Sequence, residues 1–130
     1  MQEKRLLSVD DDAGILAIIN NVAAELGFEV ETISNSTRFM TAYVRIKPDV
    51  ITLDLMMPDM DGIEVVRWLG DVGCTARVII ISGHSMFVQI AQKLAAARDG
   101  LDTTVLQKPF SVTELRAALM GAAASPTCRR

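Results

Sequence analysis

Residues 50–66 read VITLDLMMPDMDGIEVV, and this stretch decides which fold the sequence predicts. Residues 50–53 are typical of a buried strand, and they lead directly into the carboxylate of Asp54. A Met-Met-Pro turn follows, and from Ile63 the apolar residues recur at helical spacing. A strand, a turn and a helix in this order are typical of one βα unit of a parallel sheet. The charge of Asp54 has no explanation at this level, because no basic residue lies near it in the sequence.

The same alternation of strand and helix patterns recurs along the whole chain. Short apolar or alternating runs predict strands over residues 6–9, 28–33, 50–53, 78–81 and 104–106. Helical spacing predicts helices over residues 15–26, 36–46, 63–70 and 86–98 and from residue 111 onward. Ser111 and Glu114 form a capping box at the start of the last helix. Five such units in succession predict an α/β fold, a doubly wound five-stranded parallel sheet with helices on both faces.

The helical spacing also predicts which side chains face the core. In the second and last helices these are Phe39, Met40, Tyr43, Val44, Ile46, Val112, Leu115 and Leu119. The core is expected to be aliphatic, because half of the residues are apolar and few are aromatic.

Length, charge and residue counts limit the classes of function. The 130 residues suit one domain, expected over residues 1–121, with residues 122–130 as a disordered tail or truncated linker. The net charge of −3 comes from interspersed charges, which argues against direct binding of nucleic acid. No apolar run is long enough to span a membrane, and no signal peptide is expected. Two distant cysteines indicate the reducing cytoplasm, and a single histidine excludes a metal site built on several imidazoles.

Polar residues follow four of the predicted strands at the point where each strand ends. Asp10–Asp12 follow the first strand, Asp54 the third, Ser82 the fourth and Lys108 the fifth. Because the carboxyl ends of parallel strands meet at one edge of the sheet, we expect these groups to converge. Carboxylates this close repel one another unless a cation lies between them, and Mg²⁺ is the hard cation that such oxygens suit. A carboxylate beside Mg²⁺ can attack a phosphoryl group and form an aspartyl phosphate.

Four motifs at these strand ends resemble a known family. The segments are SVDDD (8–12), ITLDLMMPDMDG (51–62), IIISGH (79–84) and LQKPF (106–110). In order and spacing they resemble the signatures of response-regulator receiver domains of bacterial two-component phosphorelay signalling. The resemblance covers about residues 4–121. It implies a flavodoxin-like fold with the strand order 2-1-3-4-5 of the chemotaxis member of the family.

The resemblance also implies a role for each residue of the acidic edge. Asp54 takes the place of the phosphoacceptor and contributes to the metal site. Asp11 is similar to the direct Mg²⁺ ligand, and the backbone carbonyl of Met56 completes the protein's share of the metal shell. Asp10 resembles a helper that acts on the metal mainly through water. Asp12 is expected to cap a helix rather than to bind the metal.

Further residues match the family except at one position. Ser82 takes the place of the switch hydroxyl, and Lys108 that of the lysine that contacts the phosphoryl group. The bond between Lys108 and Pro109 resembles the family's cis peptide bond. Val105 departs from the pattern, because the family usually carries an aromatic residue three positions before the lysine. Switching by rotation of an aromatic ring is therefore not expected here.

The function that this resemblance implies is a phosphorylation-operated switch. The phosphoryl donor would be a histidine kinase or a histidine phosphotransfer protein. Phosphorylation of Asp54 would change the surface formed by the last two helices and the fifth strand. Such a domain is not an enzyme, because it catalyses only its own phosphorylation and dephosphorylation. An output domain or downstream partner and a homodimer are both compatible with the sequence, whereas membrane binding is not expected.

Two other functions stay open. One is a receiver-like binding module that is never phosphorylated. The set of Asp, Ser and Lys residues argues against it, although Val105 leaves room for an unusual output. A phosphatase with a nucleophilic aspartate is less well supported, because Met56 stands where such enzymes carry a second acid. Each motif alone also has an ordinary structural explanation, since several aspartates after a strand often form a turn and a helix cap.

Overall fold

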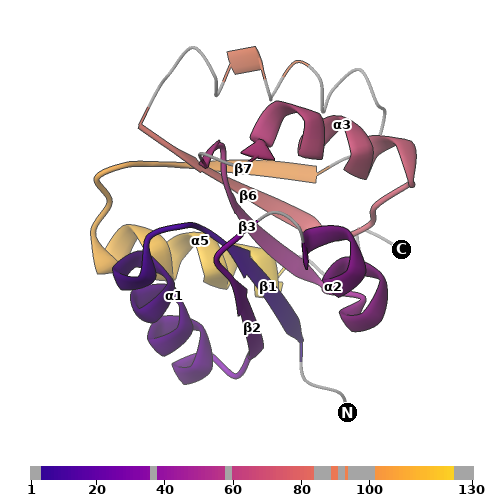
Figure 1. Ribbon diagram of the computed structural model, residues 1–130. Coiled ribbons are helices and arrows are strands. Elements are labelled where there is room, and N and C mark those ends of the chain that lie inside the picture. Colours follow the sequence, from indigo (N-terminus) through magenta and orange to yellow (C-terminus); the bar gives the residue numbers. More distant parts are fainter. Residues whose placement is uncertain are drawn as a thin grey trace.

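The computed structural model describes residues 4–35, 38–57, 60–83, 89, 90, 93 and 102–124. Its centre is a five-stranded parallel sheet in the order β2-β1-β3-β6-β7 (Figure 1). The strands are β1 (Arg5–Val9), β2 (Glu29–Ile33), β3 (Val50–Asp54), β6 (Arg77–Ser82) and β7 (Asp102–Gln107). If only the five strands of this sheet are numbered along the chain, their order is 2-1-3-4-5. The predicted doubly wound sheet is therefore confirmed.

Helices cover both faces of the sheet, as predicted (Figure 1). Helices α1 (Ala13–Glu25) and α5 (Val112–Ala124) pack together on one face. Helices α2 (Phe39–Ile46) and α3 (Gly62–Asp71) cover the other. Most of the helix predicted over residues 86–98 lies outside the described residues. Helix α5 continues three residues past the expected domain limit, and residues 125–130 also lie outside the described part.

The alternation of side chains along each strand supplies a separate core on each face. On the α2 and α3 side, Phe39 of α2 and Leu69 of α3 pack on Leu7, Ile51 and Leu53. On the α1 and α5 side the core is formed by Leu6, Ile19, Val22, Ala23, Phe28, Val50, Ile79, Ile81, Leu106, Leu115 and Leu119. A sheet that is buried on both faces needs apolar residues at successive strand positions, which explains the continuous aliphatic runs.

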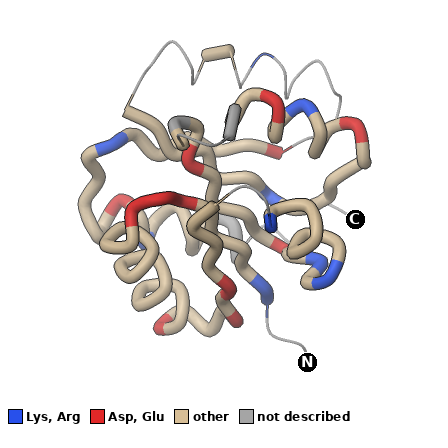
Figure 2. The backbone as a smooth tube through the Cα atoms, in the orientation of Figure 1, with Lys and Arg blue, Asp and Glu red and all other residues tan. Residues whose placement is uncertain are grey.

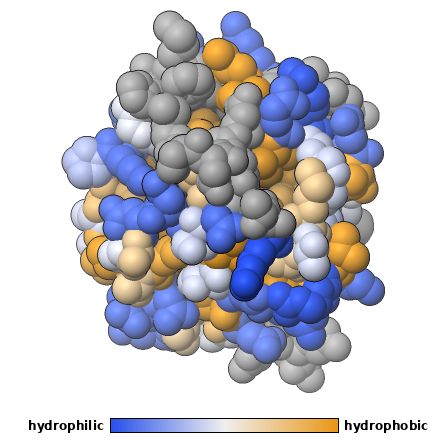
Figure 3. All heavy atoms as spheres, in the orientation of Figure 1, coloured by the Kyte–Doolittle hydropathy of each residue, from blue (hydrophilic) through white to orange (hydrophobic). Residues whose placement is uncertain are grey.

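Three side chains predicted to face the core are exposed instead. Met40 and Val44 of α2 are 52% and 64% exposed, and Val112 of α5 is 49% exposed. Helix α2 buries the stripe of Phe39 and Ala42, so residues on the opposite side of this short helix face outward. Val112 is the first residue of α5, and the residues of this helix that pack in the core, Leu115 and Leu119, come later. On the face shown in Figure 3, hydrophobic residues lie in several separate areas between hydrophilic ones.

The helix ends follow the predicted capping residues. The Asp12 side chain accepts hydrogen bonds from the backbone of Gly14 and Ile15, at 2.8 and 3.2 Å, and so caps α1. The capping box of α5 is present, with Ser111 and Glu114 exchanging hydrogen bonds of 2.8 and 3.0 Å.

None of the helices in the described part of the chain has the length and apolar character needed to cross a bilayer.

Candidate functional site

Backbone hydrogen bonds fix the residues at the carboxyl edge of the sheet. Asp10 follows β1, and its N–H donates to the carbonyl of Ile33 in β2 at 3.1 Å. Asp54 ends β3, and the next N–H, that of Leu55, donates to the carbonyl of Ile81 at 3.1 Å. Each acidic residue therefore leaves the sheet from a strand end that is tied to the neighbouring strand.

Three carboxylates meet at this edge. Asp10, Asp11 and Asp54 each offer an oxygen atom, and these atoms lie within 4.8 Å of one another. The side chains of Asp10 and Asp54 are only 1% and 3% exposed, whereas Asp11 is exposed. In Figure 2 the run Asp10–Asp12 forms a continuous acidic segment that leads into α1. Two buried carboxylates side by side are unfavourable unless positive charge compensates them.

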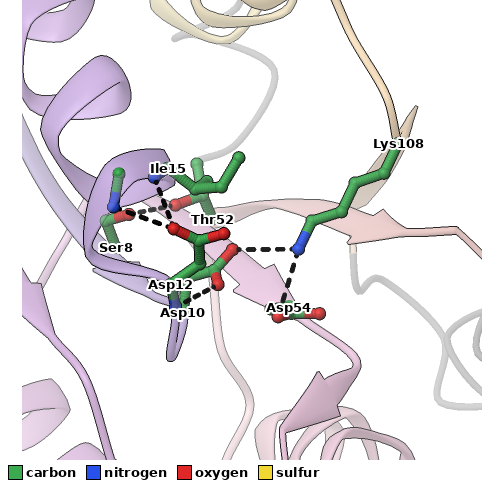
Figure 4. Close-up of polar contacts among 8 residues, drawn as sticks. Ser8, Asp10, Asp12, Ile15, Thr52, Asp54 and Lys108 are labelled. Atoms are coloured by element: carbon green, nitrogen blue, oxygen red, sulfur yellow. Dashed lines mark hydrogen bonds and ion pairs between the residues drawn. The ribbon is translucent and has the colours of Figure 1, made fainter.

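Lys108 supplies part of that charge. Its Nζ lies 3.4 Å from Asp10 Oδ2 and 3.4 Å from Asp54 Oδ2, so one ammonium serves two carboxylates (Figure 4). Both distances exceed the 2.7–2.9 Å or so of a strong charge-assisted hydrogen bond. Where only the described residues are counted, one shared cation at this distance leaves the pair of acids with an excess of negative charge.

The protonation of the site reflects this imbalance. Burial raises the pKa of Asp10 to about 6, and the neighbouring charge of Asp54 adds to the rise. The hydrogen bond from the Asp12 backbone and the charge of Lys108 act in the opposite direction. Burial alone would lower the pKa of Lys108, but the charges of Asp10 and Asp54 raise it above its ordinary value. The raised pKa of Lys108 keeps the ammonium charged, whereas burial disfavours the charged form of Asp10.

The oxygen atoms of Asp10 differ in their contacts. Oδ1 accepts a 2.9 Å hydrogen bond from the N–H of Asp12. Oδ2 is buried and, within the described part of the chain, has no hydrogen bond and only the ion pair with Lys108. An oxygen-only cluster with such an atom fits a hard divalent cation. The predicted cation site is therefore compatible with the geometry.

Ser82 is fully buried at the end of β6, one residue beyond the partner of Asp54 in the sheet register. The carbonyl of Ser82 accepts the N–H of Lys108 at 3.0 Å, so the hydroxyl and the ammonium sit on connected backbone. The bond between Lys108 and Pro109 is cis, as expected. Val105 is partly buried against the core on the α2 and α3 side.

The loop after Asp54 has a structure that the sequence analysis missed. Met56–Met57 (β4) and Met60–Asp61 (β5) form a short antiparallel pair, so the backbone of Met56 lies in a hairpin two residues beyond Asp54. Gly62 opens α3 directly against this loop. A Cβ atom on Gly62 would lie 2.5 Å from the Cα of Leu55 and 2.8 Å from its carbonyl oxygen. Only glycine allows this approach, and an Asp-Gly pair just before a predicted helix was the available signal.

A buried pair of hydroxyls beneath the acids was also missed. Thr52 Oγ1 donates a 2.7 Å hydrogen bond to Ser8 Oγ, and both side chains are fully buried (Figure 4). The signal was present, because each hydroxyl interrupts an aliphatic strand two residues before an acid.

An apolar pocket of about 430 Å³ lies beside Lys108. Its lining comes from the first turns of α1, from the segment that joins β7 to α5 and from the first residue of α5, namely Ile15, Ile18, Lys108, Pro109, Phe110 and Val112. Apolar side chains therefore border the acidic site on the α1 and α5 side.

Comparisons with known proteins identify the family and the fold. Residues 6–120 match the model of a family described as "Response regulator receiver domain". The chain is similar to sporulation initiation phosphotransferase F of Bacillus subtilis, with 30% identity over 92% of this chain and 93% of that protein. It is also 33% identical to the DNA-binding response regulator MtrA of Mycobacterium tuberculosis, over 86% of this chain but only 47% of that protein. The chain thus spans about half the length of that longer relative.

A solved structure shows the same fold. The signal receiver domain of a response regulator from Bermanella marisrubri superposes with a TM-score of 0.81 at 30% identity. The superposition covers 94% of this chain and 99% of that one. The fold of the chain therefore has a counterpart in a solved protein.

Proposed function

The chain belongs to the family of response-regulator receiver domains, and from this premise we propose that it accepts a phosphoryl group on Asp54 in a reaction that depends on Mg²⁺. The donor would be the phosphohistidine of a histidine kinase or of a histidine phosphotransfer protein. Receiver domains are signalling modules, so the chain would catalyse only its own phosphorylation and dephosphorylation.

One observation carries the proposal. Two buried carboxylates share one ammonium at 3.4 Å, and Asp10 Oδ2 keeps no hydrogen bond among the described residues. This excess of negative charge is what a divalent cation would neutralise. Asp11, Asp54 and the backbone carbonyl of Met56 would hold Mg²⁺, with Asp10 acting mainly through water. When bound, the ion would neutralise the phosphoryl oxygens and so allow an anionic nucleophile to approach.

The chain's own residues would carry the transfer. An oxygen of Asp54 attacks phosphorus, the bond between phosphorus and the donor's imidazole nitrogen breaks, and the released histidine takes up a proton. The ammonium of Lys108 already lies 3.4 Å from Asp54, and it would form an ion pair with a phosphoryl oxygen. The buried hydroxyl of Ser82 would donate to another such oxygen, which links the modification to β6.

The surroundings suit a protein donor. The apolar pocket beside Lys108 offers Ile15, Ile18, Phe110 and Val112 to a partner whose histidine must reach Asp54. The proposed location is the cytoplasm, because the two cysteines lie far apart in the sequence and make no disulfide framework.

The output would be a shift between two conformations of the surface formed by β7 and the last two helices. Most of the helix over residues 86–98 lies outside the described residues, so only β7 and α5 of this surface are placed here. Because Val105 is aliphatic and packs on the core, the shift would proceed without rotation of an aromatic ring at this position.

The test is incubation of the chain with Mg²⁺ and a small acyl phosphate, followed by intact-mass measurement. We expect one phosphoryl adduct on the wild type, none on Asp54→Asn, and none when the metal is chelated. Asp49→Asn is the matched control, because Asp49 immediately precedes the opposite end of β3. Adducts on neither the wild type nor the variants would favour the receiver-like binding module, and steady turnover of small phosphoesters would favour the phosphatase.

A further inference from the structure

A buried hydrogen bond between two hydroxyl groups lies directly below the acidic site. The proposed metal and phosphoryl chemistry does not use this bond. Ser8 in β1 and Thr52 in β3 are register partners, and their side chains share a 2.7 Å hydrogen bond. Each precedes an acid by two residues, Ser8 before Asp10 and Thr52 before Asp54. Because side chains of a strand alternate between faces, each hydroxyl points to the same side as the acid above it.

The backbone pairing of β1 and β3 stops just short of the acids. The last register pair of the two strands is Val9 with Leu53. At the next position the N–H of Asp10 turns to the carbonyl of Ile33 in β2, away from β3. The two carboxylates, whose charges repel, therefore extend beyond the β1–β3 ladder. The bond between the hydroxyls links the side chains of these strands one layer below the acids.

Stability alone does not account for this pair. Around it, Leu6, Val50, Ile79 and Ile81 form an apolar core. Replacing both partners of a buried hydrogen bond by apolar groups of the same shape is often neutral or stabilising. Polar residues that interrupt an otherwise apolar strand are therefore expected where they serve a site.

We propose that Ser8 and Thr52 are positioning residues, whose hydrogen bond holds the ends of β1 and β3 at the separation that lets Asp10 and Asp54 act on one divalent cation. This inference rests on the proposed function. The bond opposes the repulsion of the two carboxylates, which would otherwise spread the strand ends when the cation is absent. A shift of a few tenths of an ångström matters at such a site, because ligand groups must be held within about 0.5 Å of the productive geometry.

Two substitutions of Thr52 distinguish the effect of the hydroxyl group from the effect of the side chain's shape. Thr52→Val keeps the shape and loses the hydroxyl, and Thr52→Ser keeps the hydroxyl and loses a methyl group. The readouts are Mg²⁺ affinity of the metal-free protein by calorimetry, the rate of labelling by acyl phosphate, and the urea unfolding midpoint followed by Trp68 fluorescence. We expect Thr52→Val to weaken Mg²⁺ binding about tenfold, the lower end of the effect of residues that orient metal ligands. Thr52→Ser should bind Mg²⁺ as the wild type does.

A purely structural role for Thr52 predicts changes in the urea unfolding midpoint without a matching change in Mg²⁺ affinity, because the valine variant leaves the buried hydroxyl of Ser8 without its partner and the serine variant leaves a small cavity. Ser8→Ala provides a second route if Thr52→Val does not fold. The effects of Ser8→Ala and Thr52→Val on Mg²⁺ affinity should not add in the double variant, since both remove the same bond.

The outcomes distinguish this inference from the proposed function. If the wild type binds Mg²⁺ and is labelled but Thr52→Val and Ser8→Ala bind Mg²⁺ equally well, the positioning role is wrong and the proposed function stands. The positioning role is also wrong if Thr52→Ser loses as much affinity as Thr52→Val. If the wild type neither binds Mg²⁺ nor takes up a phosphoryl group, the proposed function itself fails, and the inference fails with it.

Discussion

The backbone N–H of Lys108 donates a 3.0 Å hydrogen bond to the carbonyl of Ser82, so the strand end that carries the ammonium is fixed to the strand end that carries the hydroxyl. From this position the Nζ of Lys108 lies equally far from Asp10 and Asp54, at 3.4 Å. The ammonium therefore has two separable effects. It compensates the acids in the free protein, and it would stabilise the transferred phosphoryl group.

Replacing Lys108 by methionine should separate these effects. Removing a positive charge close to the cation site should strengthen Mg²⁺ binding about tenfold, because repulsion between the two cations is lost. Labelling of Asp54 by acyl phosphate should slow by about a hundredfold, because a donor to the transition state is missing. Calorimetry and intact-mass time courses measure the two quantities. Lys4→Met, ahead of β1, should change neither, and weaker Mg²⁺ binding by Lys108→Met would contradict the assigned geometry.

The raised pKa of Asp10 predicts how the metal-free protein responds to pH. The pKa of Asp10 is about 6 in the folded protein, against an ordinary value of 3.8. Folding therefore favours the protonated form of Asp10. The stability that Asp10 contributes to the folded protein is complete below about pH 4 and is lost as the pH rises through about 6. The free energy of unfolding, measured by urea titration with a chelator present, should fall over this range by on the order of 1–3 kcal/mol.

Two variants check that Asp10 is the source of this dependence. Asp10→Asn should flatten the profile, because an amide does not titrate. Asp12→Asn should leave it unchanged, since Asp12 is exposed and asparagine is an equally good helix cap. Added Mg²⁺ should restore stability to the wild type above pH 6 and have little effect below pH 4. An unchanged profile for Asp10→Asn would assign the dependence to another group.

Gly62 should be intolerant of even a methyl group. A Cβ there would meet the backbone of Leu55 at 2.5 Å, so Gly62→Ala must displace the loop that follows Asp54. We expect a loss of about 1–3 kcal/mol in the free energy of unfolding. Labelling of Asp54 should also slow, because the backbone of Met56 shifts with the loop.

The matched control for Gly62 is Gly121 of α5, where an added Cβ meets nothing within 4 Å. Gly121→Ala should raise the free energy of unfolding by about 0.5–1 kcal/mol, because alanine favours the helix. Equal tolerance of alanine at both glycines would show that the loop after Asp54 adjusts without cost.

The parallel sheet and its acidic edge were predictable from the alternation of strand and helix patterns, whereas the order of the strands came from the family resemblance. Short β-branched runs such as residues 78–81 favour buried strands, and the topology of a parallel sheet then brings Asp10, Asp54 and Lys108 to one edge. The exposure of Met40 and Val44 was not predictable, because a helix of eight residues offers too few turns to define its buried side. The contact of Ser8 with Thr52 needed the register of β1 against β3, which the hydrophobic pattern does not specify to one residue when both faces are buried.

The apolar pocket beside Lys108 leads to the last prediction. Its residues Ile18 and Val112 are 39% and 49% exposed, and a partner that brings a phosphohistidine to Asp54 would cover them. Ile18→Asp and Val112→Asp should each slow transfer from a phosphorylated histidine phosphotransfer domain about tenfold, because a charge enters an apolar contact. Labelling by acyl phosphate should stay at the wild-type rate, since a small donor does not need this surface. Val44→Asp on α2 is the control, because Val44 is 64% exposed on the other face of the sheet and should affect neither reaction. If both rates fall together in Ile18→Asp, the substitution has disturbed the acidic site itself, and if neither falls, the donor docks elsewhere.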